Sequence, residues 1–144
     1  MREILFRGKT IKQNKGVTTE KPIKENMWVY GNLTVGEIEG YKADMISNKK
    51  EIYYIDSNTV GQYTGIKDKN GKKIFEGDIV KDLGGYMDGI PRVVVWEEET
   101  MEFETYLVKN HWAYGTNRVS LWCIKDRELE VIGNIHDNKE LLGE

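Results

Sequence analysis

The chain has 144 residues, the length of one ordinary domain, and 39% of them are hydrophobic while 31% are charged, so we expect a packed but thin core. Cys123 is the only cysteine, so no internal disulfide can form. The chain has only two histidines, so it offers few metal ligands, and we predict no metal and no cofactor. The net charge of −3 is uneven: residues 1–30 hold seven Lys or Arg against three acids, and residues 91–144 hold six against eleven.

The chain shows no signal for a membrane or for export. No window approaches the roughly 18 consecutive apolar residues of a spanning helix, and "MREILFRGKTIK" lacks the apolar core of a secretion signal. We therefore expect a cytoplasmic protein with no membrane partner.

The first half predicts short strands. Fifteen glycines and eight tyrosines with only two prolines favour a mainly β fold with tight glycine turns. Strands are expected at 3–7, 27–35, 41–47, 51–57 and 59–66. Residues 10–26 form a polar, lysine-rich arm with too few large apolar groups to offset the entropy of ordering. Gly61 interrupts its strand and marks a bulge or a close backbone approach.

The stretch "YTGIKDKNGKKIFEGDIV" at 63–80 is dense in turn chemistry. Asn70-Gly71 predicts a hairpin with a type I′ turn, because both residues tolerate a left-handed backbone. A calcium loop aligned on Gly71 would need ligands where Ile66 and Gly77 stand, so the turn is favoured. We assign structural turn roles to Gly61, Gly65, Asp68, Asn70, Gly71, Gly77 and Asp78.

Strands are next expected at 92–98, 101–108 and 128–135, the last with Gly133 bulged. Residues 118–124 fit a strand or a short helix, and Cys123 between Trp122 and Ile124 suggests a buried, inert thiol. Asp137, with Glu140 three residues on, predicts the N-cap of a short C-terminal helix.

Three kinds of functional site are open. Glu76 and Asp78 could divide acid and base roles in a carboxylate-based hydrolase, although a turn accounts for them more simply. Trp112 and Tyr114 could stack bases, or fill a core or a partner interface. Lys12, Lys15 and Lys24 of the basic arm could contact nucleic acid or an acidic partner, or only water. The chain lacks the P-loop, GxGxxG, GxSxG and HExxH patterns, so common enzyme classes lose support.

Four blocks resemble the YopX family of phage and prophage proteins. They are "REILFRGK" near the start, "WVYGNL" at 28–33, "TVGQYTGIKDKNGKKIFEGDIV" at 59–80 and "EVIGNIHDNKELL" at 130–142, in the family's order. The resemblance implies one YopX-like domain over 1–144 with SH3-type barrel character, with an N-terminal β part at about 1–60 and a barrel-like part at about 59–144. The last block departs from the family at His136 and Lys139, and the insert at 10–26 is specific to this chain.

The resemblance implies a protein of temperate phages that acts in the host bacterial cytoplasm, and it assigns no catalytic residue. Our leading hypothesis is a non-enzymatic binding or assembly module that self-associates and contacts an unidentified phage or host protein. Exposed-strand chemistry and aromatic density motivate it. Nucleic-acid binding through the basic arm is the first alternative, and the carboxylate hydrolase is the second.

Overall fold

The computed structural model describes residues 1–12, 24–38, 40–84, 89–108 and 118–143. Strands dominate these residues, so the predicted mainly β class is confirmed. The chain divides into two compact units, Met1–Tyr63 and Thr64–Glu144. None of the described helices is long and apolar enough to cross a membrane.

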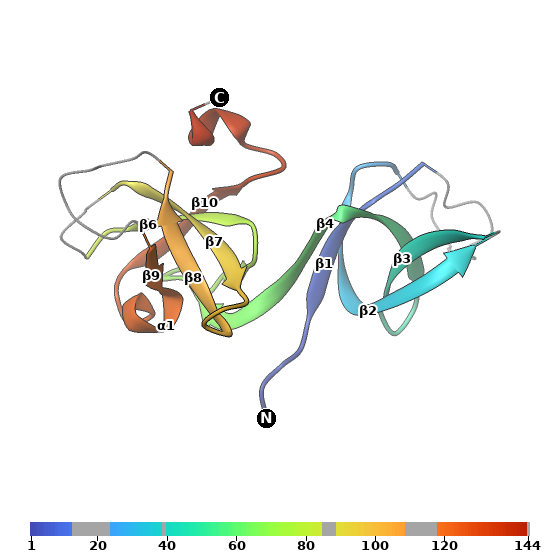
Figure 1. The fold of residues 1–144 in the computed structure, drawn as a ribbon, viewed down its shortest axis with the longest axis horizontal. Helices are drawn as coiled ribbons and strands as arrows, with labels where there is room; N and C mark the ends of the chain where they lie inside the picture. Colours follow the sequence, from blue (N-terminus) through green and yellow to red (C-terminus); the bar gives the residue numbers. More distant parts are fainter. Residues whose placement is uncertain (13–23, 39, 85–88, 109–117, 144) are drawn as a thin grey trace. The chain divides into compact units, whose positions relative to one another are not determined.

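The first unit is a small closed barrel (Figure 1). Its strands are β1 (Phe6–Thr10), β2 (Trp28–Ile38), β3 (Tyr41–Ser47) and β4 (Ile52–Lys67), of which the last four residues belong to the second unit. All neighbouring pairs are antiparallel, and β1 pairs with both β2 and β4, which closes the ring. The barrel core consists of Val29, Ile46, Tyr53 and Ile55.

Two glycines allow the strands to close this tightly. A Cβ at Gly8 would lie 2.5 Å from Ile55 Cδ1, and one at Gly31 would collide with the carbonyl oxygen of Ser47. The resemblance led us to expect the barrel within about 59–144, whereas the closed ring of strands is β1–β4. Closure of the ring depends on Gly8 and Gly31, which lie upstream of that range.

The two strands expected at 51–57 and 59–66 are one strand, β4, with a bulge in the middle. Opposite β1 the register passes from Gly61 directly to Asp56, so residues 57–60 face the single residue Gly8. The hydroxyl of Thr59 holds this bulge, because it accepts the backbone N–H of Lys9 and donates to the carbonyl of Asp56. The bulge therefore lies immediately before Gly61.

The second unit holds the end of β4 and a separate sheet. Its strands are β5 (Lys73–Phe75), β6 (Asp78–Asp82), β7 (Pro91–Glu97), β8 (Glu102–Leu107), β9 (Arg118–Ser120) and β10 (Leu129–Asn134). The sheet has the order β10-β6-β7-β8-β9, while β5 is an extra strand next to β4. Apolar residues from these strands and from the helix α1 (Leu121–Ile124) form the core, namely Ile74, Val80, Val94, Phe103, Leu121, Ile124 and Leu129.

The C-terminal elements resolve two expectations. Residues 118–124, expected to be a strand or a short helix, form both, one after the other, because strand β9 continues directly into helix α1. The register shift between Val131 and Gly133 is the expected bulge of the last strand.

The terminal helix differs from its prediction in one respect. It is a 3-10 turn, η2 (Lys139–Leu142), and its N-cap is Asn138 rather than Asp137, without a side-chain capping bond. The Asp137 assignment was wrong because Asn134 makes the turn instead: its Oδ1 accepts the N–H groups of His136 and Asp137.

Candidate functional site

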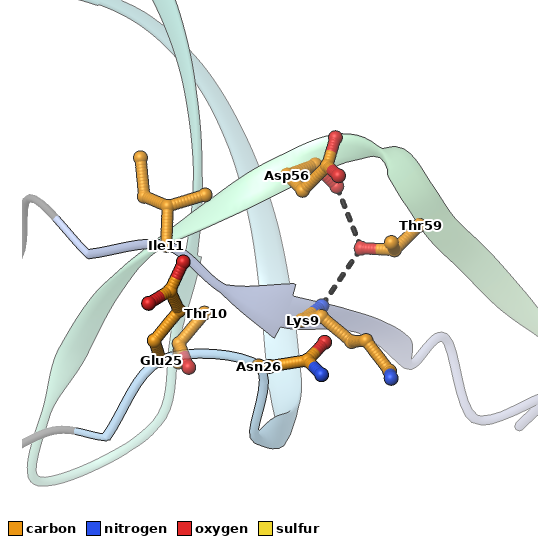
Figure 2. A pocket seen from close by; sticks show the side chains of 7 residues that line it. All are labelled: Lys9, Thr10, Ile11, Glu25, Asn26, Asp56 and Thr59. Carbon is orange, nitrogen blue, oxygen red and sulfur yellow. Dashed lines mark hydrogen bonds between the residues drawn. The ribbon is translucent and has the colours of Figure 1, made fainter. Parts of the chain in front are cut away.

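A cavity of about 350 Å³ opens in the first unit (Figure 2). It lies where the end of β1, the chain entering β2 and the bulge of β4 meet. The lining residues are Lys9, Thr10, Ile11, Glu25, Asn26, Asp56 and Thr59. None of the site residues predicted from the sequence is among them.

Hydrogen bonds to Thr10 fix the wall formed by the returning arm. The Thr10 hydroxyl donates to the carbonyl of Lys24 and accepts the N–H of Met27. The backbone carbonyl of Thr10 accepts the N–H of Asn26. Asn26 has φ 63°, a left-handed conformation that asparagine tolerates better than most residues. The two ends of the polar arm are therefore held together at the cavity.

The cavity offers polar groups but no activated nucleophile among its lining residues. Both threonine hydroxyls bond to backbone groups, and Figure 2 shows the backbone N–H of Lys9 donating to the hydroxyl of Thr59. Asp56 Oδ1 accepts the backbone and side-chain N–H groups of Asn58. The buried Lys9 ammonium lies 5.3 Å from the Trp28 ring centroid, and the Arg7 guanidinium lies 4.6 Å from the same ring. Such a hollow can bind a small polar group.

The predicted hairpin around Asn70-Gly71 forms, but with a different turn. The N–H of Gly71 donates to the carbonyl of Asp68, and the N–H of Asp68 donates to the carbonyl of Lys72. Gly71 has φ 80°, whereas Asn70 does not have a positive φ. This is a three-residue loop in which a turn is followed by a left-handed glycine, so the type I′ prediction was wrong.

Asp68 explains the turn that forms. Its Oδ1 accepts the N–H groups of Asn70 at 2.8 Å and Lys72 at 2.9 Å. Its Oδ2 accepts the N–H of Val131 in β10 at 3.1 Å, so one carboxylate ties the hairpin to the last strand. Asp68 is only 7% exposed. It therefore serves as a backbone acceptor.

Gly77 and Asp78 form the next corner. Gly77 has φ 84°, its N–H donates to the carbonyl of Val94, and its carbonyl accepts the N–H of Ile135. Asp78 is 1% exposed, and its Oδ2 accepts the N–H of Phe75. Glu76 is half-buried, and neither carboxylate lines the cavity. The geometry supports a structural role for Asp78. Gly65, with φ 86°, is a further left-handed glycine.

The residues predicted for nucleic-acid contact are only partly described. Lys12 and Lys24 are exposed at the two ends of the arm, next to residues that line the cavity. Lys15, Trp112 and Tyr114 lie outside the described residues. Contact of nucleic acid with these lysines and with the aromatic pair stays a prediction.

Cys123 is exposed, and the expectation of a buried thiol was wrong. It lies in α1, where Leu121 and Ile124 are buried while Trp122 and Cys123 face outward. A strand reading of 118–124 would have placed Cys123 on the buried side with Leu121. Three residues apart on a helix, Leu121 and Ile124 share the inner face instead.

Three exposed apolar side chains of the second unit were missed by the sequence analysis. Trp96 is 39% exposed, with its ring edge-on to Phe103 at 5.0 Å between centroids. Trp122 is 68% exposed, and the Lys125 ammonium lies 4.5 Å from its ring. Met101 is 71% exposed and has φ 57°, which is unfavourable for an unbranched non-glycine residue. Exposure of such residues has no signal in a single sequence.

The described residues include no group of three or more His, Cys, Asp or Glu side chains that could hold a metal ion.

Comparison with known proteins identifies the family. No curated protein matches the sequence. The crystal structure of protein EF1440 from Enterococcus faecalis is similar, with 23% identity, coverage of 99% of each chain and a TM-score of 0.45. The model of the YopX protein family matches residues 6–143. The chain therefore belongs to the YopX family.

Proposed function

We propose that the chain is a phage- or prophage-encoded binding or assembly module that associates with further copies of itself and with a phage or host protein in the host cytoplasm. We propose that this module binds its partners without catalysing a reaction. The observation that carries the proposal is the exposure of Trp96 in β7, Met101 in the turn between β7 and β8, and Trp122 in α1. Aromatic and Met side chains are enriched at protein interfaces, and covering them removes apolar surface from water.

The hydrogen bonding of the central carboxylates supports a non-catalytic role. Asp68 and Asp78 both accept backbone N–H groups, so their charge is used to hold turns. A carboxylate in this role lacks the free oxygen and solvent access that a general base requires. The stretch 63–80 then serves as scaffold for the surfaces around it.

Sedimentation velocity over a range of protein concentrations tests self-association. We expect the average mass to rise above that of one 16.7 kDa chain, and to fall back when Trp122 is replaced by Ser. Tyr30, 46% exposed on the barrel, provides the matched control as Tyr30→Ser. A strict monomer at high concentration would remove self-association from the proposal.

A second candidate function is nucleic-acid binding, which the position of Lys12 and Lys24 favours. The bonds at Thr10 hold the two ends of the basic arm together, so both exposed lysines flank one site. Lys9 and Arg7 contribute less, since both are buried against Trp28. Binding to DNA or RNA should weaken steeply with salt and on Lys12→Ala with Lys24→Ala, while Lys49→Ala with Lys50→Ala leaves it unchanged.

A further inference from the structure

The hairpin between β4 and β5 carries a dense positive charge. Residues 67–73, the lysine hairpin, contain Lys67, Lys69, Lys72 and Lys73. The first three are exposed, and Lys67 and Lys72 make no ion pair with the described residues. Lys69 reaches Glu130 only at 3.8 Å. The only acid of the hairpin, Asp68, is buried against backbone N–H groups, so the outer surface of the hairpin is positive.

The hairpin between β7 and β8 carries the opposite charge. Residues 97–104, the glutamate hairpin, contain five glutamates and no basic residue. Arg118 pairs with Glu97 and Glu104, and the Ser120 hydroxyl donates to Glu102. The remaining carboxylates, on Glu98 and Glu99, are exposed and make no ion pair with the described residues.

The two hairpins cannot easily neutralise each other within one unit. The lysine hairpin borders β10, because the N–H of Lys69 donates to Leu129 and Asp68 accepts the N–H of Val131. The glutamate hairpin joins β7 and β8, which are the third and fourth strands of a sheet that begins with β10. Lys67, Lys72, Glu98 and Glu99 therefore remain available to another molecule.

The charge of the second unit argues against a nucleic acid at the lysine hairpin. Residues 64–144 hold eleven Lys or Arg against sixteen Asp or Glu, a balance of −5. A negatively charged unit repels a nucleic acid at long range. A small acidic patch on a protein partner can still pair with the lysines at close range, because salt screens the more distant charges. The described residues of the lysine hairpin also include no exposed aromatic ring on which a base could stack.

We propose that the lysine hairpin of one copy docks on the glutamate hairpin of a second copy. This rests on the self-association in the proposed function and names a charged contact that acts beside the exposed Trp122. The two surfaces differ, so the contact is heterologous and adds subunits head to tail into a ring or a filament. Met101 stands among the glutamates at 71% exposure, and the methylene stems of the lysines can cover it.

The geometry of both hairpins suits a weak, salt-sensitive contact. Asp68 holds the lysine loop in one conformation before binding, which reduces the entropy lost on association. Exposed charge pairs contribute little each and are screened by salt, so a single contact is weak. Repetition around a ring or along a filament adds contacts without strengthening any one of them.

Charge reversal tests the proposal. Variant A carries Lys67→Glu and Lys72→Glu, variant B carries Glu98→Lys and Glu99→Lys, and a third chain carries all four changes. Lys49→Glu with Lys50→Glu, on exposed residues of the barrel, is the control with the same change in net charge as variant A. Association of the purified full chains is measured by sedimentation velocity at low and high salt, with thermal unfolding to show that each variant is folded.

The expected result has three parts. Variants A and B each lose at least about tenfold in association constant at low salt, because like charges then face each other. The equimolar mixture of A and B associates again, and so does the four-change chain, while the control behaves like the unchanged chain. High salt weakens association of the unchanged chain.

Two results would overturn the proposal, and they separate it from the proposed function. If A and B associate like the unchanged chain, or if mixing them restores nothing, the hairpins do not pair, although self-association stands. If the unchanged chain is a monomer under all conditions, self-association and the hairpin contact both fall.

Discussion

Replacing the buried Asp68 with Ala should destabilise the second unit more than replacing any of the exposed residues of the hairpin. The substitution removes the acceptor of three backbone N–H groups, those of Asn70, Lys72 and Val131, at 2.8, 2.9 and 3.1 Å. Hydrogen bonds to a charged acceptor contribute about 1.5–3 kcal/mol each when buried. These three are only partly buried, so about 1 kcal/mol each, or about 3 kcal/mol in total, is expected.

Asp68→Asn separates the hydrogen bonds within the loop from the hydrogen bond to β10. The amide oxygen can still accept both loop N–H groups, but the NH₂ group then faces the N–H of Val131. We expect a loss of about 1.5 kcal/mol, from one hydrogen bond and the repulsion between two donors. Asp126→Ala is the matched control, because that carboxylate is exposed and, among the residues that the structure describes, pairs with Lys125 alone.

Thermal unfolding and hydrogen exchange together test the argument. For a unit of this size, about 3 kcal/mol corresponds to a fall in Tm of about 12–24 °C. Protection of the Val131 amide should fall in both Asp68 variants and stay unchanged in Asp126→Ala. The reasoning would fail if Asp68→Ala melted like the control, or if Val131 kept its protection while Tm fell.

Further expectations concern the surface of the second unit. Met101→Asn should raise the free energy of unfolding by about 0.5–1 kcal/mol, because asparagine tolerates φ 57° better, and a fall in urea midpoint would contradict this. The N–H of Glu99, and to a smaller extent the guanidinium of Arg118, lower the pKa of Glu97. The ionised carboxylate therefore stabilises the fold at a pH above its unfolded pKa, and this stabilisation is lost as the pH falls through its folded pKa. Arg118→Ala should therefore raise the pKa of Glu97 part of the way to its ordinary value in a carboxyl NMR titration, and no change would contradict the pairing. Cys123 should react with a thiol reagent in the folded protein nearly as fast as in denaturant, and slow reaction would contradict its exposure.

The fold class was predictable because it depends on local signals. Alternating apolar residues and glycine turns give strands wherever they occur, so β7, β8 and β10 lie close to the expected ranges. The bulge near Gly133 was also predictable, since a glycine inside an apolar strand marks a break in pairing.

Several of the errors have one physical cause, which is contact with a distant part of the chain. Asn70-Gly71 alone favours a type I′ turn, but the Asp68 carboxylate and β10 select another loop. Cys123 appears buried from its apolar neighbours, but the core accepts Leu121 and Ile124 on one helical face. The cavity joins residues about fifty positions apart, so no local pattern could show it.

Strand pairing also changes the argument for self-association. The sequence suggested contacts through exposed strand edges, and in the barrel each of the four strands has a neighbour on both sides, although residues 32–38 of β2 pair only with β3. At the outer edge of β10, the carbonyl of Leu129 and the N–H of Val131 are already engaged with Lys69 and Asp68. At this edge of β10, a partner strand would find fewer unpaired backbone groups with which to extend the sheet. In the second unit we therefore expect association to depend on side chains, and the lysine and glutamate hairpins carry exposed groups of opposite charge.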